Sequence, residues 1–356
     1  MSLFTILLLQ HEKDMLKPEK IENLLIRSTN WIGDAVMSTP AVRAIRKNFP
    51  NARISLLAKP WVAPVFENSP YIDQIIPYNF EGALRTIKAA GMLEKYGFDA
   101  TILLQNAFEA AWVAYLAKIP VRIGYDTHLR KVLLTHPVHR SSRILKLHQT
   151  HYYNEILKGV GLRIDGTHLE LYLSPKDHDS ARKILKDSNI FETDFVVGIN
   201  PSATYGSAKQ WFPDRFARVS DQLNKRFGSK TVIFGGPNDR ELGANIMKMM
   251  KTFAVDLSGK TTLKEAMAII ARCRLFLTND SGLMHIAAAL NVPQVAIFGS
   301  TDFAATGPWS TRARIVRSLV DCSPCLKKQC PLGHKECMKK ISVEKVLTTA
   351  CDMILK

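Results

Sequence analysis

Residues 21–58 read IENLLIRSTNWIGDAVMSTPAVRAIRKNFPNARISLLA, and they set the pattern for the rest of the chain. A short apolar run over residues 21–27 is followed by a polar loop and by apolar residues at helical spacing. A second apolar run then occupies residues 53–58. A strand, a loop, a helix and another strand in this order predict the βαβ unit of a parallel sheet.

The same alternation continues on both sides of a polar, charged stretch at residues 174–193. Before that stretch we expect strands at residues 74–76, 100–104 and 122–124 and helices at residues 84–95 and 107–117. After it we expect strands at residues 195–200, 231–234, 274–278 and 294–298 and helices at residues 213–227, 239–250, 262–272 and 343–355. Two such series predict an α/β protein with two Rossmann-like, doubly wound domains facing each other across a cleft.

The predicted boundaries divide the chain into three parts. Residues 1–20 form an extension, residues 21–175 the first domain and residues 176–356 the second. The second domain carries a cysteine-rich segment at residues 322–337 and a terminal helix that we expect to reach back to the first domain.

The composition is that of an ordinary globular protein, with 46% hydrophobic and 22% charged residues. No apolar run reaches the roughly 18–20 residues needed to span a membrane. The apolar run at residues 4–9 lacks the basic region and the small-residue cleavage site of a signal peptide. We therefore expect a cytoplasmic location.

The net charge of +16 over 356 residues favours an anionic partner, which can be a nucleic acid, an acidic membrane or a phosphorylated substrate. The basic stretches lack the interleaved aromatic residues of a nucleic-acid-binding module, so nucleic acid is the remote alternative. One segment is especially basic and is either an anion-facing surface or simply a solvated face; it contains Arg122, Arg130, Lys131, Arg140, Arg143 and Lys146.

Four of the six cysteines are clustered near the carboxyl end. Four thiolates at short spacing are able to hold zinc, but these do not form two repeated C-x2-C pairs. Disulfides are disfavoured in a reducing compartment. We therefore expect reduced or adventitiously oxidised thiols, with zinc as the alternative, at these positions, which are Cys322, Cys325, Cys330 and Cys337.

The stretch TNDSGLMH at residues 278–285 follows an apolar run and begins a helix. Free N–H groups and the helix dipole favour a phosphate at such a helix start. Ser281 adds a hydroxyl, Gly282 allows a ligand to approach the backbone, and His285 can donate from the first turns. The alternative is an ordinary helix cap followed by a core histidine.

Asp280 would repel a phosphate placed on it. We expect this carboxylate to cap N–H groups or to hold another loop, and a cation is then needed nearby. Lys209, in a loop that follows another predicted strand, is the candidate for that cation.

Asp34 lies at the end of the first loop, where a strand ends and a helix begins. A carboxylate at this edge of the sheet would face the predicted cleft and is suited to act as a general base on a sugar hydroxyl. The alternative for Asp34 is an ordinary helix N-cap.

Three stretches together resemble the ADP-heptose:lipopolysaccharide heptosyltransferases, a family of inverting glycosyltransferases with the GT-B fold. They are STNWIGDAVMSTPA at residues 28–41, NPSATYGSAKQWFP at residues 200–213 and TNDSGLMHIAAAL at residues 278–290. The cysteine segment CSPC-x4-CPLGH resembles the branch of the family that adds the second heptose of the inner core.

The resemblance implies roles for individual residues. Asp34 matches the catalytic aspartate, and Lys209 matches the lysine that contacts the donor diphosphate, with Thr204 in the same nucleotide-binding loop. Glu241 falls where an acidic residue would meet the ribose hydroxyls, although Asp239 competes for that place. The nucleotide-sugar motif of the family matches Asp280, Ser281, Gly282 and His285.

The resemblance also implies a reaction: transfer of L-glycero-D-manno-heptose from ADP-heptose to the first heptose of Kdo-lipid A, without a cofactor or metal. Arg122, Arg130 and Lys131 would face the anions of this acceptor. We expect a monomer at the cytoplasmic face of the inner membrane, with no nucleic-acid partner. The nearer alternative is a related heptosyltransferase that adds the first or the third heptose.

Overall fold

The structure, a computed structural model, describes residues 16–355 and divides into two compact units, Met1–Thr167 and His168–Lys356. The first part of the predicted extension, residues 1–15, lies outside the described residues. The remainder includes a single 3-10 turn, η1 (Pro18–Lys20). Each unit is described by itself below.

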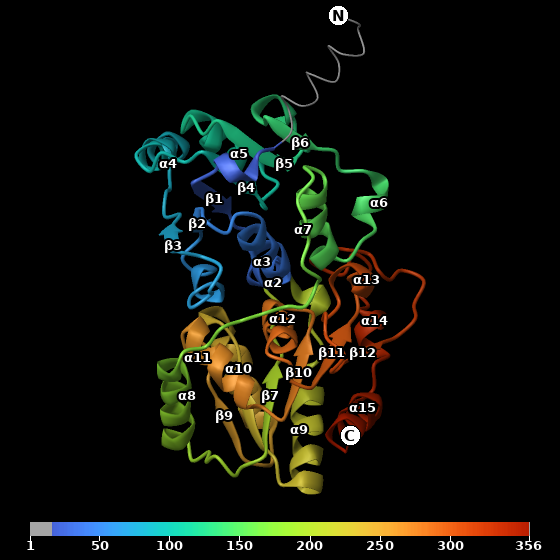
Figure 1. Cartoon of the computed structure of the whole chain (residues 1–356). Coiled ribbons are helices and arrows are strands. Elements are labelled where there is room, and N and C mark those ends of the chain that lie inside the picture. Colours follow the sequence, from blue (N-terminus) through green and yellow to red (C-terminus); the bar gives the residue numbers. More distant parts are fainter. Residues whose placement is uncertain (1–15, 356) are drawn as a thin grey trace, which may run out of the picture. The chain divides into compact units, whose positions relative to one another are not determined.

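The first unit contains a six-stranded parallel sheet in the order β3-β2-β1-β4-β5-β6 (Figure 1). Its strands are β1 (Asn23–Arg27), β2 (Arg53–Ala58), β3 (Gln74–Pro77), β4 (Ala100–Leu103), β5 (Val121–Tyr125) and β6 (His136–Val138). Its α-helices are α2 (Ile32–Met37), α3 (Thr39–Asn48), α4 (Arg85–Glu94), α5 (Phe108–Leu116), α6 (Ser142–Leu145) and α7 (Gln149–Lys158), with 3-10 turns η2 (Ala63–Val65) and η3 (Arg130–Leu133).

The sequence forms this sheet because its central strands are mostly apolar and almost entirely buried. Strand β1 pairs in parallel with both β2 and β4, so that Leu25 lies opposite Ser55 on one side and Thr101 on the other. Helices α4 and α5 pack on each other over a core that includes Leu25, Leu57 and Leu103. Helices α2 and α3 pack against α7.

The second unit repeats the plan with the strand order β12-β11-β10-β7-β8-β9 (Figure 1). Its strands are β7 (Val196–Asn200), β8 (Lys230–Ile233), β9 (Ala254–Asp256), β10 (Leu275–Asn279), β11 (Gln294–Phe298) and β12 (Ala313–Arg317). Its helices are α8 (Pro175–Asp187), η4 (Ser207–Lys209), α9 (Pro213–Phe227), η5 (Pro237–Asp239), α10 (Arg240–Met249), α11 (Leu263–Arg272), α12 (Gly282–Ala289), α13 (Phe303–Thr306), α14 (Glu336–Lys339) and α15 (Val343–Ile354).

The terminal helix α15 packs on α9 and on strands β10, β11 and β12 of its own unit. The indole of the buried Trp211 donates to the carbonyl of Ile341 at 3.0 Å, which ties the segment before α15 to the loop before α9. The predicted terminal helix is present as α15, and it packs on the hydrophobic core of the second unit.

Both sheets are doubly wound, with the strand order reversing next to β1 and β7, so the predicted α/β architecture with two Rossmann-like units is confirmed. In such sheets ligands bind beyond the carboxyl ends of the strands. None of the helices described between residues 16 and 355 combines the length and apolar character required to cross a bilayer.

Candidate active site

The start of α12 carries the first predicted ligand contacts. Ser281, not Asp280, is the N-cap of this helix, and its hydroxyl accepts the N–H of Met284 at 3.4 Å. The side-chain amide of Asn200, from the end of β7, donates to the same hydroxyl at 2.6 Å. The cap is therefore held by a neighbouring strand end, and the first N–H groups of α12 face the edge of the sheet where ligands bind.

Asp280 holds the loops around this helix start together. One carboxylate oxygen accepts from the Lys209 ammonium at 2.6 Å and from the Thr301 hydroxyl at 2.6 Å. The side chains of Lys209 and Asp280 are only 13% and 5% exposed. The structure thus brings the predicted cation and the predicted carboxylate into contact, and Asp280 holds a loop rather than capping a helix.

The Lys209 loop is braced by the cysteine-rich segment. The Ala208 N–H donates to the carbonyl of Lys328 at 3.0 Å, and the Tyr205 hydroxyl donates to the carbonyl of Leu326 at 3.1 Å. A Cβ atom on Gly206 would lie 2.2 Å from the carbonyl oxygen of Lys328. The cysteine-rich segment therefore packs closely against the loop that carries Lys209, and only a glycine at position 206 leaves room for this contact.

We predict that Gly206→Ala weakens ADP binding about tenfold, because overpacking costs about 1–3 kcal/mol and displaces the Lys209 loop. Titration calorimetry with ADP measures the effect. Gly91→Ala is the matched control, since a Cβ atom there meets nothing within 4 Å. Equal ADP affinity in the two variants would show that the contact with Lys328 does not position the loop.

The remaining predicted donor contacts lie around the same edge of the second sheet. Thr204 is exposed in the Lys209 loop, and Glu241 is exposed in the first turn of α10. Asp239 is occupied: its carboxylate accepts from the Gly236 N–H at 2.7 Å and from the Ser202 hydroxyl at 2.6 Å. Of the two acidic candidates, Glu241 is the accessible one. His285 is buried on α12.

Asp34 lies in the first turn of α2, and the N-cap residue of that helix is Trp31, not Asp34. The Tyr153 hydroxyl, from α7, donates to Asp34 Oδ1 at 3.0 Å. Burial, reinforced by the Asp34 carboxylate, raises the pKa of Tyr153 well above its ordinary value. Tyr153 therefore remains a neutral donor, and it orients a half-buried carboxylate at the carboxyl end of β1.

We predict that Tyr153→Phe moves the acidic limb of the kcat/KM pH profile to higher pH by about one unit. A hydrogen bond to a carboxylate favours its charged form and contributes about 1.5–3 kcal/mol, so its loss raises the pKa of Asp34. Tyr96→Phe, at an exposed tyrosine, is the control. A profile that falls in height without moving would contradict the positioning of Asp34 by Tyr153.

Two of the three predicted acceptor cations hold the backbone of their own unit. The guanidinium of Arg122 donates to the carbonyls of Leu133 and Ile119. Arg130 is fully buried, and its guanidinium donates to the carbonyls of Tyr125 at 2.6 Å and Gln105 at 2.5 Å. Burial lowers the pKa of Arg130 to about 10.

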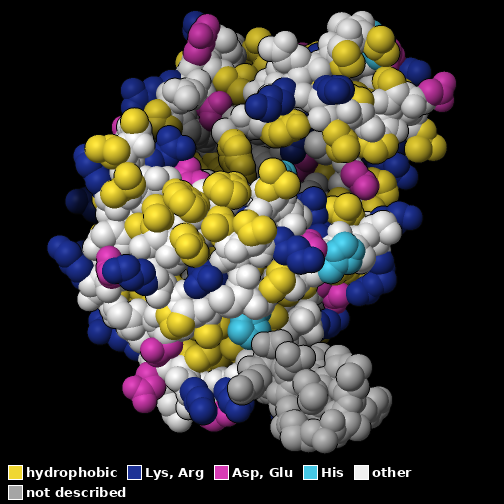
Figure 2. Space-filling view, turned by 90° about the horizontal axis from the view of Figure 1, so that it is seen from above, with side chains coloured by type: hydrophobic (Ala, Val, Ile, Leu, Met, Phe, Trp, Pro, Cys, Tyr) yellow, Lys and Arg dark blue, Asp and Glu magenta, His cyan; other side chains and the backbone are white. Residues whose placement is uncertain are grey.

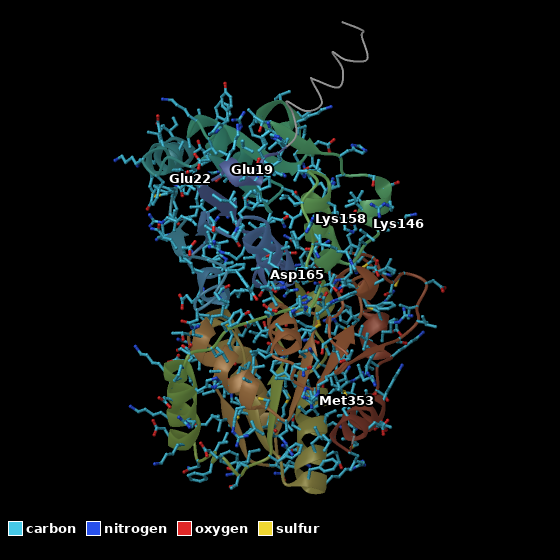
Figure 3. The ribbon with its side chains drawn as sticks, in the orientation of Figure 1. Glu19, Glu22, Lys146, Lys158, Asp165 and Met353 are labelled. Atoms are coloured by element: carbon cyan, nitrogen blue, oxygen red, sulfur yellow. The ribbon has the colours of Figure 1, made fainter. Side chains whose placement is uncertain are left out.

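Two other cations of the basic segment are exposed to solvent. Lys131 is exposed on η3, and Lys146 is exposed at the end of α6 (Figure 3). Because Arg122 and Arg130 already donate to backbone carbonyls, these exposed lysines are more accessible to an anion than those two arginines.

The four clustered cysteines are free thiols that line one small cavity of about 20 Å³ together with His334. Cys330 receives the N–H of Lys335, which lowers the pKa of its thiol. Within residues 16–355, no group of three or more His, Cys, Asp or Glu side chains is arranged to hold a metal ion. The backbone carbonyls of Leu326 and Lys328 in this segment accept hydrogen bonds from the Lys209 loop.

Comparison with known proteins finds relatives of this chain in one family. The model of glycosyltransferase family 9 (heptosyltransferase) matches residues 87–336. The chain is 32% identical to lipooligosaccharide heptosyltransferase 2 of Campylobacter jejuni over 91% of this chain and 96% of that protein. It is 29% identical to lipopolysaccharide heptosyltransferase 2 of Escherichia coli, over 94% and 99% of the two chains.

Solved structures agree with the sequence relatives. The structure of ADP-heptose lps heptosyltransferase II of Escherichia coli matches with a TM-score of 0.81 and 27% identity, covering 94% of this chain and 98% of that chain. A glycosyl transferase family 9 structure from Veillonella parvula has a TM-score of 0.84 at 24% identity, over 96% and 99% of the two chains, and shows the shared fold.

Proposed function

This chain belongs to glycosyltransferase family 9, the heptosyltransferases, and we propose that it transfers L-glycero-D-manno-heptose from ADP-heptose to the first heptose of the Kdo-lipid A inner core. The relatives named heptosyltransferase 2 match nearly the whole chain. A relative named lipopolysaccharide heptosyltransferase 3, from Escherichia coli, matches at 27% identity over 78% of the chain. This difference favours transfer of the second heptose over the related reactions.

The observation that carries the donor proposal is the Lys209–Asp280 pair at the start of α12. An ammonium group has three donors, so Lys209 can keep its bond to Asp280 and still donate to a phosphate. The free N–H groups of α12 supply further donors and a partial positive charge. The ADP diphosphate would lie between these groups, with Thr204 and Glu241 available to the nucleoside.

The acceptor step would use Asp34. Its carboxylate takes the proton of the acceptor hydroxyl while the hydroxyl oxygen forms a bond to the anomeric carbon of the heptose. The bond from that carbon to the ADP oxygen breaks on the opposite face, so the configuration inverts. This step requires Asp34 and the bound donor to meet during catalysis.

The departing ADP would carry the charge released by this bond cleavage. Lys209, held by its ion pair with Asp280, and the start of α12 would stabilise that charge with fixed donors. These two groups meet the charge of the diphosphate, so the proposal includes no divalent metal.

The test is incubation of the purified protein with ADP-heptose and mono-heptosylated Kdo-lipid A. We expect release of one ADP for each heptose transferred and inverted configuration at the new linkage, determined by NMR. Transfer only to an acceptor without heptose, or only to one that already carries two, would replace this proposal by one of the related reactions.

We also propose that this protein acts as a monomer at the cytoplasmic face of the inner membrane, where a lipid-anchored acceptor is presented. Large apolar side chains are exposed on α4, α5 and η3, which are neighbours in the first unit. Figure 2 shows hydrophobic side chains gathered among Lys and Arg side chains on the face seen from above. Apolar residues bordered by cations suit an acidic bilayer. Those on these elements or directly before them are Leu84, Ile87, Phe108, Tyr115, Leu129 and Val132.

We predict that the double variant Leu129→Asn with Val132→Ser binds vesicles containing phosphatidylglycerol at least about tenfold more weakly. The two side chains are 87% and 85% exposed, and burial of each apolar side chain contributes about 1.5–3 kcal/mol. Co-sedimentation measures binding, and Leu319→Ser, at an exposed leucine of the second unit, is the control. Equal sedimentation of the variants would contradict the assignment of this surface.

A further inference from the structure

A cavity of about 350 Å³ opens at the carboxyl edge of the first sheet, and Asp34 does not line it. Its wall is built by residues at or just beyond the ends of adjacent strands. Arg27 ends β1, Lys59 directly follows β2, and Tyr78 directly follows β3. In doubly wound sheets this edge is where ligands bind, and the volume is sufficient for a single sugar unit.

Arg27 is a buried cation in this wall, only 4% exposed. Its guanidinium donates to the carbonyl of Ser28 at 2.6 Å and to the side-chain oxygen of Asn30 at 2.9 Å, and it lies 4.8 Å from the centroid of the Tyr78 ring. Each of these partners is uncharged, and within the described chain no carboxylate forms an ion pair with Arg27. Burial lowers the pKa of Arg27 and the Glu109 carboxylate raises it electrostatically, but the direct ion pair of that carboxylate is with Arg85. A buried cation without a direct ion pair is costly, so this position favours an anion.

Lys59 is the second cation without a carboxylate partner among the described residues. Its ammonium lies 4.5 Å from the centroid of the same Tyr78 ring. Burial and the neighbouring charge of Arg27 lower the pKa of Lys59. Two like charges thus converge on one ring, and an anion between them would relieve their repulsion.

The carboxylates of the wall do not cancel this charge. Glu109 pairs with Arg85 at 2.8 Å and also accepts from the Tyr78 hydroxyl. Glu81 is exposed at the rim. The wall holds three cations, Arg27, Lys59 and Arg85, and two carboxylates, so the net charge of the cavity is positive. Among the described residues, Arg27 and Lys59 form no ion pair with a carboxylate, whereas Arg85 pairs with Glu109.

We propose that this cavity binds the anionic group, a carboxylate or a phosphate, of a sugar in the acceptor, an inference that rests on the proposed function. Asn30, in the wall, belongs to the loop that connects β1 to α2 and leads to Asp34. An acceptor anchored here is held at the same edge of the sheet as the proposed base. Arg27 and Lys59 thereby take the role that the sequence alone suggested for Arg122 and Arg130.

The first experiment compares Lys59→Gln with Lys95→Gln, a variant of an exposed lysine of the same unit outside the cavity wall. We expect Lys59→Gln to raise the acceptor KM about tenfold while kcat and the affinity for ADP stay unchanged, because a charge-assisted hydrogen bond to the acceptor is lost. Lys95→Gln should behave as the wild type. An unchanged acceptor KM in Lys59→Gln overturns the inference.

The second experiment separates the two sources of the anion. The wild type and Lys59→Gln are assayed with an acceptor whose phosphates have been removed and with one whose sugar carboxylate has been reduced to an alcohol. The acceptor that lacks the recognised anion should give the same KM with both proteins. If the tenfold difference persists with both modified acceptors, the cavity does not recognise an anion and the inference is wrong.

A direct binding measurement keeps this inference distinct from the proposed function. A free sugar acid and a free sugar phosphate are titrated into the full chain and followed by ligand-observed NMR. Binding of either one that is weakened in Lys59→Gln but not in Lys95→Gln supports the cavity even if no heptose is transferred. Absence of binding together with normal heptose transfer would contradict anion binding by the cavity and leave the proposed function intact.

Discussion

Asp34→Asn is expected to lower kcat about 10²–10⁴-fold, the range that positioned proton transfer contributes. The asparagine side chain keeps the shape of the aspartate and can still accept from the Tyr153 hydroxyl at Oδ1. It cannot take the proton of the acceptor hydroxyl. The change therefore removes the base and leaves the local structure of α2 in place.

Turnover at saturating concentrations of both substrates measures this loss. ADP affinity, measured by calorimetry, should stay at the wild-type value because Asp34 belongs to the first unit and the donor contacts belong to the second. The kcat/KM pH profile of Asp34→Asn should also lack the acidic limb, which Tyr153→Phe only moves to higher pH. Near-normal turnover of Asp34→Asn would remove Asp34 from the role of base.

The central strands could be predicted from the sequence because they are buried on both faces. A parallel strand of this kind is a nearly continuous apolar run, and the runs at residues 53–58 and 294–298 coincide with β2 and β11. Strands β6, β9 and β12 lie at sheet edges and were missed. Strands β6 and β9 have three residues each, and the apolar residues of β12 are interrupted by two arginines, so none has a long apolar run.

Helix α8 was missed for a related reason. Only Ala181 and Leu185 are buried on it, so its apolar stripe is too narrow to stand out in a charged stretch. The capping box formed by Ser174 and Asp177 was the available signal, because it marks a helix start independently of hydrophobic periodicity.

The neighbourhood of Lys209 and Asp280 could be expected from the sequence, because both residues follow strands that end at the same edge of the second sheet. Tyr153 could not be found in this way. It lies on α7, far from Asp34 in sequence, and meets it only through the packing of α7 on α2.

The basic segment shows what the number of charged residues cannot predict. A count of charges cannot distinguish Arg130, which is fully buried and donates to backbone carbonyls, from Arg27, which also donates to backbone carbonyls but lines the cavity at the end of β1. The sequence predicted Arg27 only as the last residue of a strand, because its neighbours Lys59 and Tyr78 come together with it only when β1, β2 and β3 are aligned in the sheet.

Lys209→Ala is expected to weaken ADP binding about 10–100-fold and to slow transfer as well, since a charge-assisted hydrogen bond contributes about 1.5–3 kcal/mol in the ground state. The substitution has a second effect. It leaves the carboxylate of Asp280, which is 5% exposed, with the Thr301 hydroxyl but without its ammonium partner. The protein should therefore lose stability, and the uncompensated carboxylate should repel the diphosphate.

The double variant Lys209→Ala with Asp280→Asn separates these effects, because it removes the uncompensated carboxylate and keeps the loss of the ammonium. If Lys209 contacts the donor, the double variant regains thermal stability but still binds ADP at least about tenfold more weakly than the wild type. If Lys209 only holds its loop against Asp280, ADP affinity recovers together with the Tm. Calorimetry with ADP and thermal unfolding of the three proteins therefore decide whether the buried ion pair is a structural link or the cationic side of the diphosphate site.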